Sequence, residues 1–94
     1  MTGKTVLIVD DEASIREMIA VALEMADYNC LEAADALEAH TLIVDKQPDL
    51  ILLDWMLPGT SGVELARRLK KDEATADIPI IMLTAKVEED NKIQ

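Results

Sequence analysis

Three continuously apolar runs limit the folds that this chain can adopt. They cover residues 5–9, 50–53 and 78–83, and they consist almost entirely of aliphatic residues, many of them β-branched. A strand with one solvent-exposed face alternates apolar and polar residues. Continuous apolar runs of this length are instead typical of strands buried on both faces of a parallel sheet. The shorter apolar stretch at residues 28–33 predicts one further strand.

Segments with helical periodicity lie between these runs. Apolar residues recur at helical spacing over residues 14–25, where Ser14 and Glu17 form a candidate capping pair. Similar patterns predict helices over residues 35–45 and 63–71. The residues expected to face the sheet from these last two helices are Leu37, Ala39, Leu42, Ile43, Leu65, Ala66 and Leu69.

Strands that alternate with helices of this length define an α/β fold with a parallel sheet and right-handed crossovers. A chain of 94 residues has room for one domain with one core. That core must be aliphatic, because the sequence has one Trp, one Tyr and no Phe. The polar segment 88–94 is expected to open a fourth helix.

The charge balance bears on possible partners. A formal net charge of −10 argues against direct contact with nucleic acid, because duplex binding needs Lys and Arg to displace counterions. The balance suits a cation site or basic protein partners, or it serves solubility alone. The single cysteine, Cys30, allows no intramolecular disulfide, and neither a signal peptide nor a membrane span is visible. We therefore expect a cytoplasmic protein without membrane contact.

Acidic and hydroxyl residues follow the apolar runs. Asp10 and Asp11 come after the first run, Asp54 after the second and Thr84 after the third. In open α/β sheets, ligands bind at the carboxyl ends of the strands, so we expect these side chains to share one edge. Three carboxylates at one edge repel one another unless a cation or a proton compensates. Mg²⁺ is such a cation, since proteins hold it through a few carboxylates, waters and substrate phosphate.

A carboxylate beside such a metal can attack phosphorus and form an aspartyl phosphate. The metal neutralises the phosphoryl oxygens, and a hydroxyl such as that of Thr84 can donate a hydrogen bond to one of them. The pattern therefore predicts a metal and phosphoryl site. The alternative interpretation makes Asp10 and Asp11 helix-capping residues and Asp54 an ordinary loop acid.

Three segments resemble the signature blocks of response-regulator receiver domains, in particular those of the OmpR/PhoB subfamily. They are VDDE at residues 9–12, LLDWMLPGTSG at 52–62 and IIMLTA at 80–85, and the resemblance covers the whole chain in order. It implies a flavodoxin-like (CheY-like) doubly wound parallel sheet with strand order 2-1-3-4. It also implies a phosphoacceptor module of two-component signalling, not an enzyme, with a sensor histidine kinase as phosphodonor and control of transcription as output.

The resemblance assigns roles to matching residues. Asp54 would be the phosphoacceptor. Asp11 and Asp54 would ligate Mg²⁺ by side chain, with the main-chain carbonyl of Met56 as a third protein ligand. Asp10 would act through a metal-bound water, and Thr84 would be the switch hydroxyl. A phosphohydrolase with an aspartyl nucleophile is disfavoured, because Met56 stands where such enzymes need a general acid.

The chain departs from the family pattern after the run at residues 78–83. Receiver domains continue with a fifth strand and a lysine that contacts the phosphoryl group, whereas this sequence ends at Gln94. We expect residues 1–94 to form an incomplete receiver domain that lacks the fifth βα unit and any DNA-binding domain. The run 80–83 would then lie at an exposed sheet edge, covered by self-association or by a complementary polypeptide. A non-signalling fragment that acts as an interaction or assembly module is the alternative function.

Overall fold

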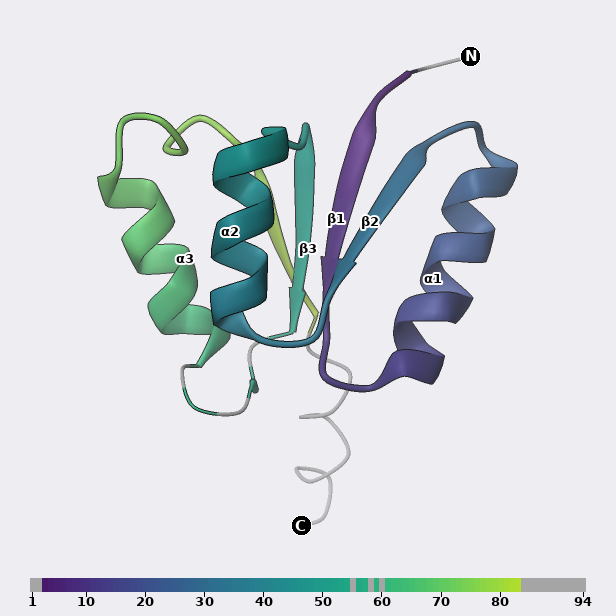
Figure 1. The fold of residues 1–94 in the computed structure, drawn as a ribbon, viewed down its shortest axis with the longest axis horizontal. Coiled ribbons are helices and arrows are strands. Elements are labelled where there is room, and N and C mark those ends of the chain that lie inside the picture. Colours follow the sequence, from purple (N-terminus) through teal and green to yellow (C-terminus); the bar gives the residue numbers. More distant parts are fainter. Residues whose placement is uncertain (1–2, 55, 58, 60, 84–94) are drawn as a thin grey trace, which may run out of the picture.

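The expected alternation of strands and helices runs through the described chain (Figure 1). The computed structural model describes residues 3–54, 56–57, 59 and 61–83. The elements are β1 (Thr5–Val9), α1 (Ala13–Met25), β2 (Asn29–Ala33), α2 (Ala36–Lys46), β3 (Leu50–Asp54), α3 (Gly62–Lys71) and β4 (Ile80–Leu83). All strand pairs are parallel and the order is β2-β1-β3-β4, which confirms the predicted topology.

The strand order reverses between β1 and β3. The chain leaves β1 toward β2 on one side, then crosses back over β1 to form β3 on its other side. Val9 pairs with Leu53 in the register of these two strands, so the residues that follow each strand emerge next to each other. This is the position at which open α/β sheets bind their ligands.

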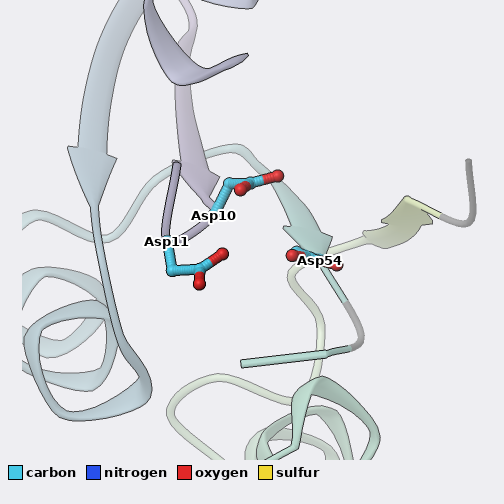
Figure 2. A group of neighbouring side chains, drawn as sticks. All are labelled: Asp10, Asp11 and Asp54. Atoms are coloured by element: carbon cyan, nitrogen blue, oxygen red, sulfur yellow. The ribbon is translucent and has the colours of Figure 1, made fainter. Parts of the chain in front are cut away.

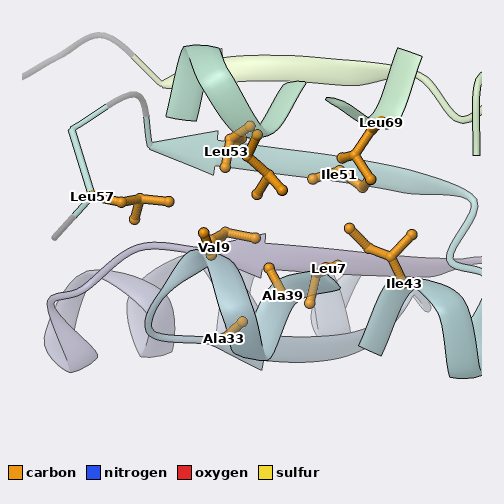
Figure 3. Close-up of a cluster of buried hydrophobic side chains, with 11 residues drawn as sticks. Leu7, Val9, Ala33, Ala39, Ile43, Ile51, Leu53, Leu57 and Leu69 are labelled. Atoms are coloured by element: carbon orange, nitrogen blue, oxygen red, sulfur yellow. The ribbon is translucent and has the colours of Figure 1, made fainter. Parts of the chain in front are cut away.

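Helices cover both faces of the sheet. Val6 and Ile8 of β1 pack with Ala20 of α1 on one face. On the opposite face, side chains of β1 and β3 meet α2 and α3 (Figure 3). The buried residues of this larger cluster are Leu7, Val9, Ala33, Ala36, Ala39, Ile43, Ile51, Leu53, Leu57, Leu65 and Leu69. The core is aliphatic, as the composition predicts.

Two local predictions are wrong. Ser14 does not cap α1: the helix begins at Ala13 after Glu12, and no side chain caps it. The turn after β1 is short, so the chain enters the helix two residues earlier than the Ser14 and Glu17 pair suggests. Leu37 does not face the sheet but is 78% exposed. Because α2 starts after its N-cap Asp35, Ala36, Ala39 and Ile43 form the buried face, and Leu37 is turned away from it.

The fourth strand is shorter and less buried than expected. It begins at Ile80, not at residue 78, and pairs with β3 on one side only among the residues that the structure describes. Ile81 is 52% exposed, whereas the residues of β1 from Val6 onward are buried. The helix expected over residues 88–94 lies outside the described residues. No helix within the described ranges is long and apolar enough to cross a membrane.

Candidate metal centre

Three carboxylates from two strand ends converge at the switch point of the sheet. Asp10 and Asp11 follow β1, and Asp54 is the last residue of β3. The carboxylates of Asp10 and Asp11 point from the turn after β1 toward Asp54 (Figure 2). One ligand oxygen from each residue lies within 4.8 Å of the others. The structure thus brings together all three acids that the sequence singles out.

Hydrogen bonds with main-chain groups of other residues hold both the main chain and the side chain of Asp10. Its N–H donates to the carbonyl oxygen of Ala33 at the end of β2, at 3.1 Å. Its carboxylate oxygen Oδ1 accepts a hydrogen bond of 2.9 Å from the main-chain N–H of Glu12. Asp10 is only 2% exposed. A carboxylate this deeply buried needs such donors, because burial without them is costly.

Asp54 is held in a similar way. It is 1% exposed, and its Oδ1 accepts a hydrogen bond of 3.2 Å from the main-chain N–H of Met56. This contact turns the segment after β3 back toward the carboxylate. On the side of β3 that faces away from β1, Asp54 pairs in register with Leu83 of β4. Asp11, in contrast, is exposed, so the cluster has a buried floor and one solvent-facing side.

An arginine that none of the sequence motifs includes contacts the same turn. Arg16 of α1 donates from Nη1 to the carbonyl oxygen of Asp10 at 2.7 Å. Its Nε donates to Oε1 of Glu32 on β2 at 3.0 Å. A signal was available, because Arg16 is the only Lys or Arg between Lys4 and Lys46. Helical spacing alone does not reveal that its side chain reaches back to the preceding turn.

The donor set suits a hard divalent cation. Carboxylate oxygens favour Mg²⁺, Ca²⁺ or Mn²⁺ over the softer metals that prefer thiolate or imidazole. Three such oxygens within 4.8 Å of one another, with one carboxylate exposed, can share a cation that keeps part of its water shell. Asp10, Asp11 and Asp54 are therefore the described residues that fit a metal ion at this edge.

The structure describes only one of the two other residues predicted at this site, Met56 and Thr84. Met56 lies beside the cluster through its N–H bond to Asp54, and its side chain is exposed. The role of its carbonyl as a ligand stays a prediction. Thr84, the expected switch hydroxyl, lies outside the described residues, as do Trp55 and Pro58.

Cys30 lies away from this chemistry. It is half-buried on β2 and packs against the cluster around Val6 and Ile8. Burial raises the pKa of its thiol, and the negative charges of Glu24 and Glu32 raise that pKa further. A raised pKa keeps the thiol protonated at neutral pH and lowers its reactivity.

Comparison with known proteins shows to which family the chain belongs. The model of the response regulator receiver domain matches residues 6–94, and the chain belongs to this family. Over all 94 residues it is 80% identical to the phosphate regulon transcriptional regulatory protein PhoB of Pseudomonas aeruginosa. It is 45% identical over 92 residues to PhoB of Escherichia coli. The chain spans 41% of the first relative's length and 40% of the second's. The expected resemblance to receiver domains of the PhoB type is confirmed.

Solved structures agree with the fold. The N-terminal domain of a response regulator receiver protein from Methanoculleus marisnigri superposes with a TM-score of 0.84 at 40% identity, covering 94% of this chain and 74% of that one. The chemotaxis response regulator CheY4 of Vibrio cholerae gives a TM-score of 0.82 at 31% identity, covering 94% of this chain and 78% of that one. The flavodoxin-like, CheY-type architecture is thus confirmed.

The charge cluster predicts that removing one carboxylate stabilises the metal-free chain. In Asp10→Asn the amide oxygen can still accept the Glu12 N–H, but one of three neighbouring negative charges is lost. We expect the free energy of unfolding without divalent cations to rise by about 1 kcal/mol. Urea denaturation in the presence of a chelator measures this.

The exposed Asp77, which is remote in sequence from the cluster, provides the control variant Asp77→Asn, for which little change is expected. Saturating Mg²⁺ should stabilise the unmodified chain more than Asp10→Asn. Mutual repulsion within the cluster is contradicted if Asp10→Asn is less stable than the unmodified chain in the chelator. It is also contradicted if Asp10→Asn and Asp77→Asn gain the same stability there.

Proposed function

We propose that this chain is the phosphoacceptor receiver module of a two-component response regulator, phosphorylated on Asp54 in the presence of Mg²⁺. The observation that carries the proposal is the convergence of Asp10, Asp11 and Asp54 within 4.8 Å at the switch point of the sheet. Membership of the receiver-domain family supports it. The buried Asp54 at the end of β3 is the nucleophile, and the acids after β1 serve the cation.

Asp11 and Asp54 would hold Mg²⁺ through their carboxylates, with the main-chain carbonyl of Met56 as third protein ligand and Asp10 acting through a water. When bound, the ion supplies positive charge that offsets both the carboxylates and the phosphoryl oxygens. The chain's own contribution is orientation. The N–H of Met56 fixes the plane of the Asp54 carboxylate, and the N–H of Glu12 fixes that of Asp10.

The transfer itself is a displacement at phosphorus. An oxygen of Asp54 forms a bond to the phosphorus of the donor's phosphohistidine as the phosphorus–nitrogen bond breaks. The released imidazole takes up a proton, and the product is an acyl phosphate on Asp54. Thr84 would donate a hydrogen bond to a phosphoryl oxygen. A sensor histidine kinase is the phosphodonor that this chemistry requires.

Control of transcription is the output that we infer for the protein to which this module belongs. The relatives from Pseudomonas aeruginosa and Escherichia coli are named as phosphate regulon transcriptional regulatory proteins, which supports the same role here. Contact with DNA would fall to a part of the protein other than this acidic segment, whose net charge is −10. Such a regulator would work in the cytoplasm.

The nucleophile is tested by labelling. Asp54→Asn should abolish incorporation of phosphate from acetyl phosphate or phosphoramidate, because an amide cannot attack phosphorus. Intact-mass measurement gives the readout, and the chelator should also prevent labelling of the unmodified chain. Asp77→Asn is again the matched control and should label normally.

The same measurement separates this proposal from its alternatives. A receiver accumulates a slowly hydrolysing adduct, a hydrolase turns the donor over without accumulating one, and an assembly module does neither. Undiminished labelling of Asp54→Asn would show that another residue is the acceptor.

We also propose that the outer edge of β4 is an association surface when the 94-residue polypeptide is studied by itself. No strand pairs with this edge among the described residues, and Ile81 is 52% exposed. Uncharged apolar edges recruit further strands, whereas natural edges are protected by charges. A second copy or a complementary polypeptide would therefore cover β4.

Sedimentation velocity tests this surface. The polypeptide should associate with increasing concentration, and Ile81→Lys should reduce that association by placing a charge on the edge strand. Leu37→Lys is the control, because Leu37 is equally apolar and more exposed but lies on α2. A monomer at all concentrations, with β4 amides strongly protected from hydrogen exchange, contradicts the proposal.

A further inference from the structure

The contacts of Arg16 link three elements around the candidate metal centre. The residue lies in the first turn of α1, and its guanidinium spans from the turn after β1 to the neighbouring strand β2. One donor, Nη1, bonds the carbonyl oxygen of Asp10 at 2.7 Å, and another, Nε, bonds Oε1 of Glu32 at 3.0 Å. The side chain is only 16% exposed, and its bond to the Asp10 carbonyl is partly buried, whereas its bond to Glu32 is exposed and more weakly shielded from water.

We propose that Arg16 is a positioning residue, which holds the turn after β1 in the conformation that presents Asp10 and Asp11 to a divalent cation. The inference rests on the proposed function. Three hydrogen bonds then fix Asp10: its N–H to Ala33, its carboxylate to Glu12 and its carbonyl to Arg16. The first and the third hold the main chain on the two sides of the Asp10 α-carbon, where the turn begins.

The geometry requires arginine and not merely a positive charge. A guanidinium presents several N–H donors in a rigid plane, so it can hold a main-chain oxygen and a carboxylate at the same time. A lysine ammonium is a single point charge on a flexible side chain, so it cannot hold the two acceptors in the same fixed geometry. Glu32 keeps the guanidinium in place from β2, and its side chain is itself 36% exposed.

The charge of Arg16 by itself predicts the opposite effect on metal binding. A guanidinium close to the carboxylates repels a divalent cation, so its removal would tighten Mg²⁺ binding if charge were all that mattered. A positioning role predicts weaker binding, because the turn that carries Asp10 and Asp11 loses its support. The sign of the change in affinity therefore separates the two roles.

Mg²⁺ titration of the chain, followed by the fluorescence of its single tryptophan or by calorimetry, is the first measurement. Loss of the groups that orient metal ligands weakens affinity by about 10- to 100-fold. Because Arg16 acts through the main chain, we expect the lower end for Arg16→Ala, about tenfold. Arg16→Lys should lie between Arg16→Ala and the unmodified chain, and Glu32→Gln, which keeps an oxygen acceptor, should change affinity least.

Arg67→Ala is the matched control. Arg67 also pairs with a glutamate, Glu64, at 3.2 Å, but this pair is exposed on α3. Its removal should leave Mg²⁺ affinity unchanged. Tighter or unchanged Mg²⁺ binding in both Arg16→Ala and Arg16→Lys overturns the proposal. If Arg16→Ala fails to fold, the result for Arg16→Lys decides.

Amide hydrogen exchange without metal is the second measurement and does not depend on the proposed function. The N–H of Glu12, which bonds the Asp10 carboxylate, should lose protection in Arg16→Ala while amides of β3 keep theirs. Equal protection of Glu12 in both proteins overturns the positioning role. If the unmodified chain binds no Mg²⁺ at all, the proposed function fails, and the exchange experiment still decides the role of Arg16.

Discussion

The parallel pairing of β1 with β3 is the constraint on which the site depends. Val9 and Leu53 are partners in this register, so Asp10 and Asp54 leave the sheet side by side although they are 44 positions apart in the chain. A shift by one residue would turn the buried side chains of a strand toward the opposite face. Because β1 is buried on both faces and Ile51 and Leu53 of β3 are buried on one, packing against α1, α2 and α3 fixes this register. The aliphatic core therefore determines where the acids meet.

The site acts against the stability of the fold that builds it. Two of its three carboxylates are almost completely buried, and all three lie close together. Part of the free-energy cost of burying these charges is offset by hydrogen bonds. The donors are the main-chain N–H groups of Glu12 and Met56 and the guanidinium of Arg16. Strain of this kind is common at functional sites, which natural sequences tolerate when the rest of the core compensates. A cation relieves the repulsion, so binding and stability are linked.

Much of this arrangement could be predicted from local patterns. Continuous apolar runs identify the strands, and the residues that follow them identify Asp10, Asp11 and Asp54, because a parallel sheet gathers its strand ends at one edge. Faces of helices were harder to predict. Leu37 is apolar yet exposed, since the start of α2 at Ala36 decides which residues turn inward. The contact of Arg16 with the Asp10 carbonyl could not be predicted, because it depends on the path of the turn, which side-chain patterns do not encode.

We propose that Asp11 and Asp54 share a divalent cation with the main-chain carbonyl of Met56. A crystal structure of the chain grown with Mn²⁺ in place of Mg²⁺ tests it most directly, because the anomalous signal locates the ion. We expect a single strong peak about 2.1 Å from a carboxylate oxygen of Asp11, a carboxylate oxygen of Asp54 and the carbonyl oxygen of Met56. An absent peak at saturating Mn²⁺, or a peak away from these three residues, would contradict it.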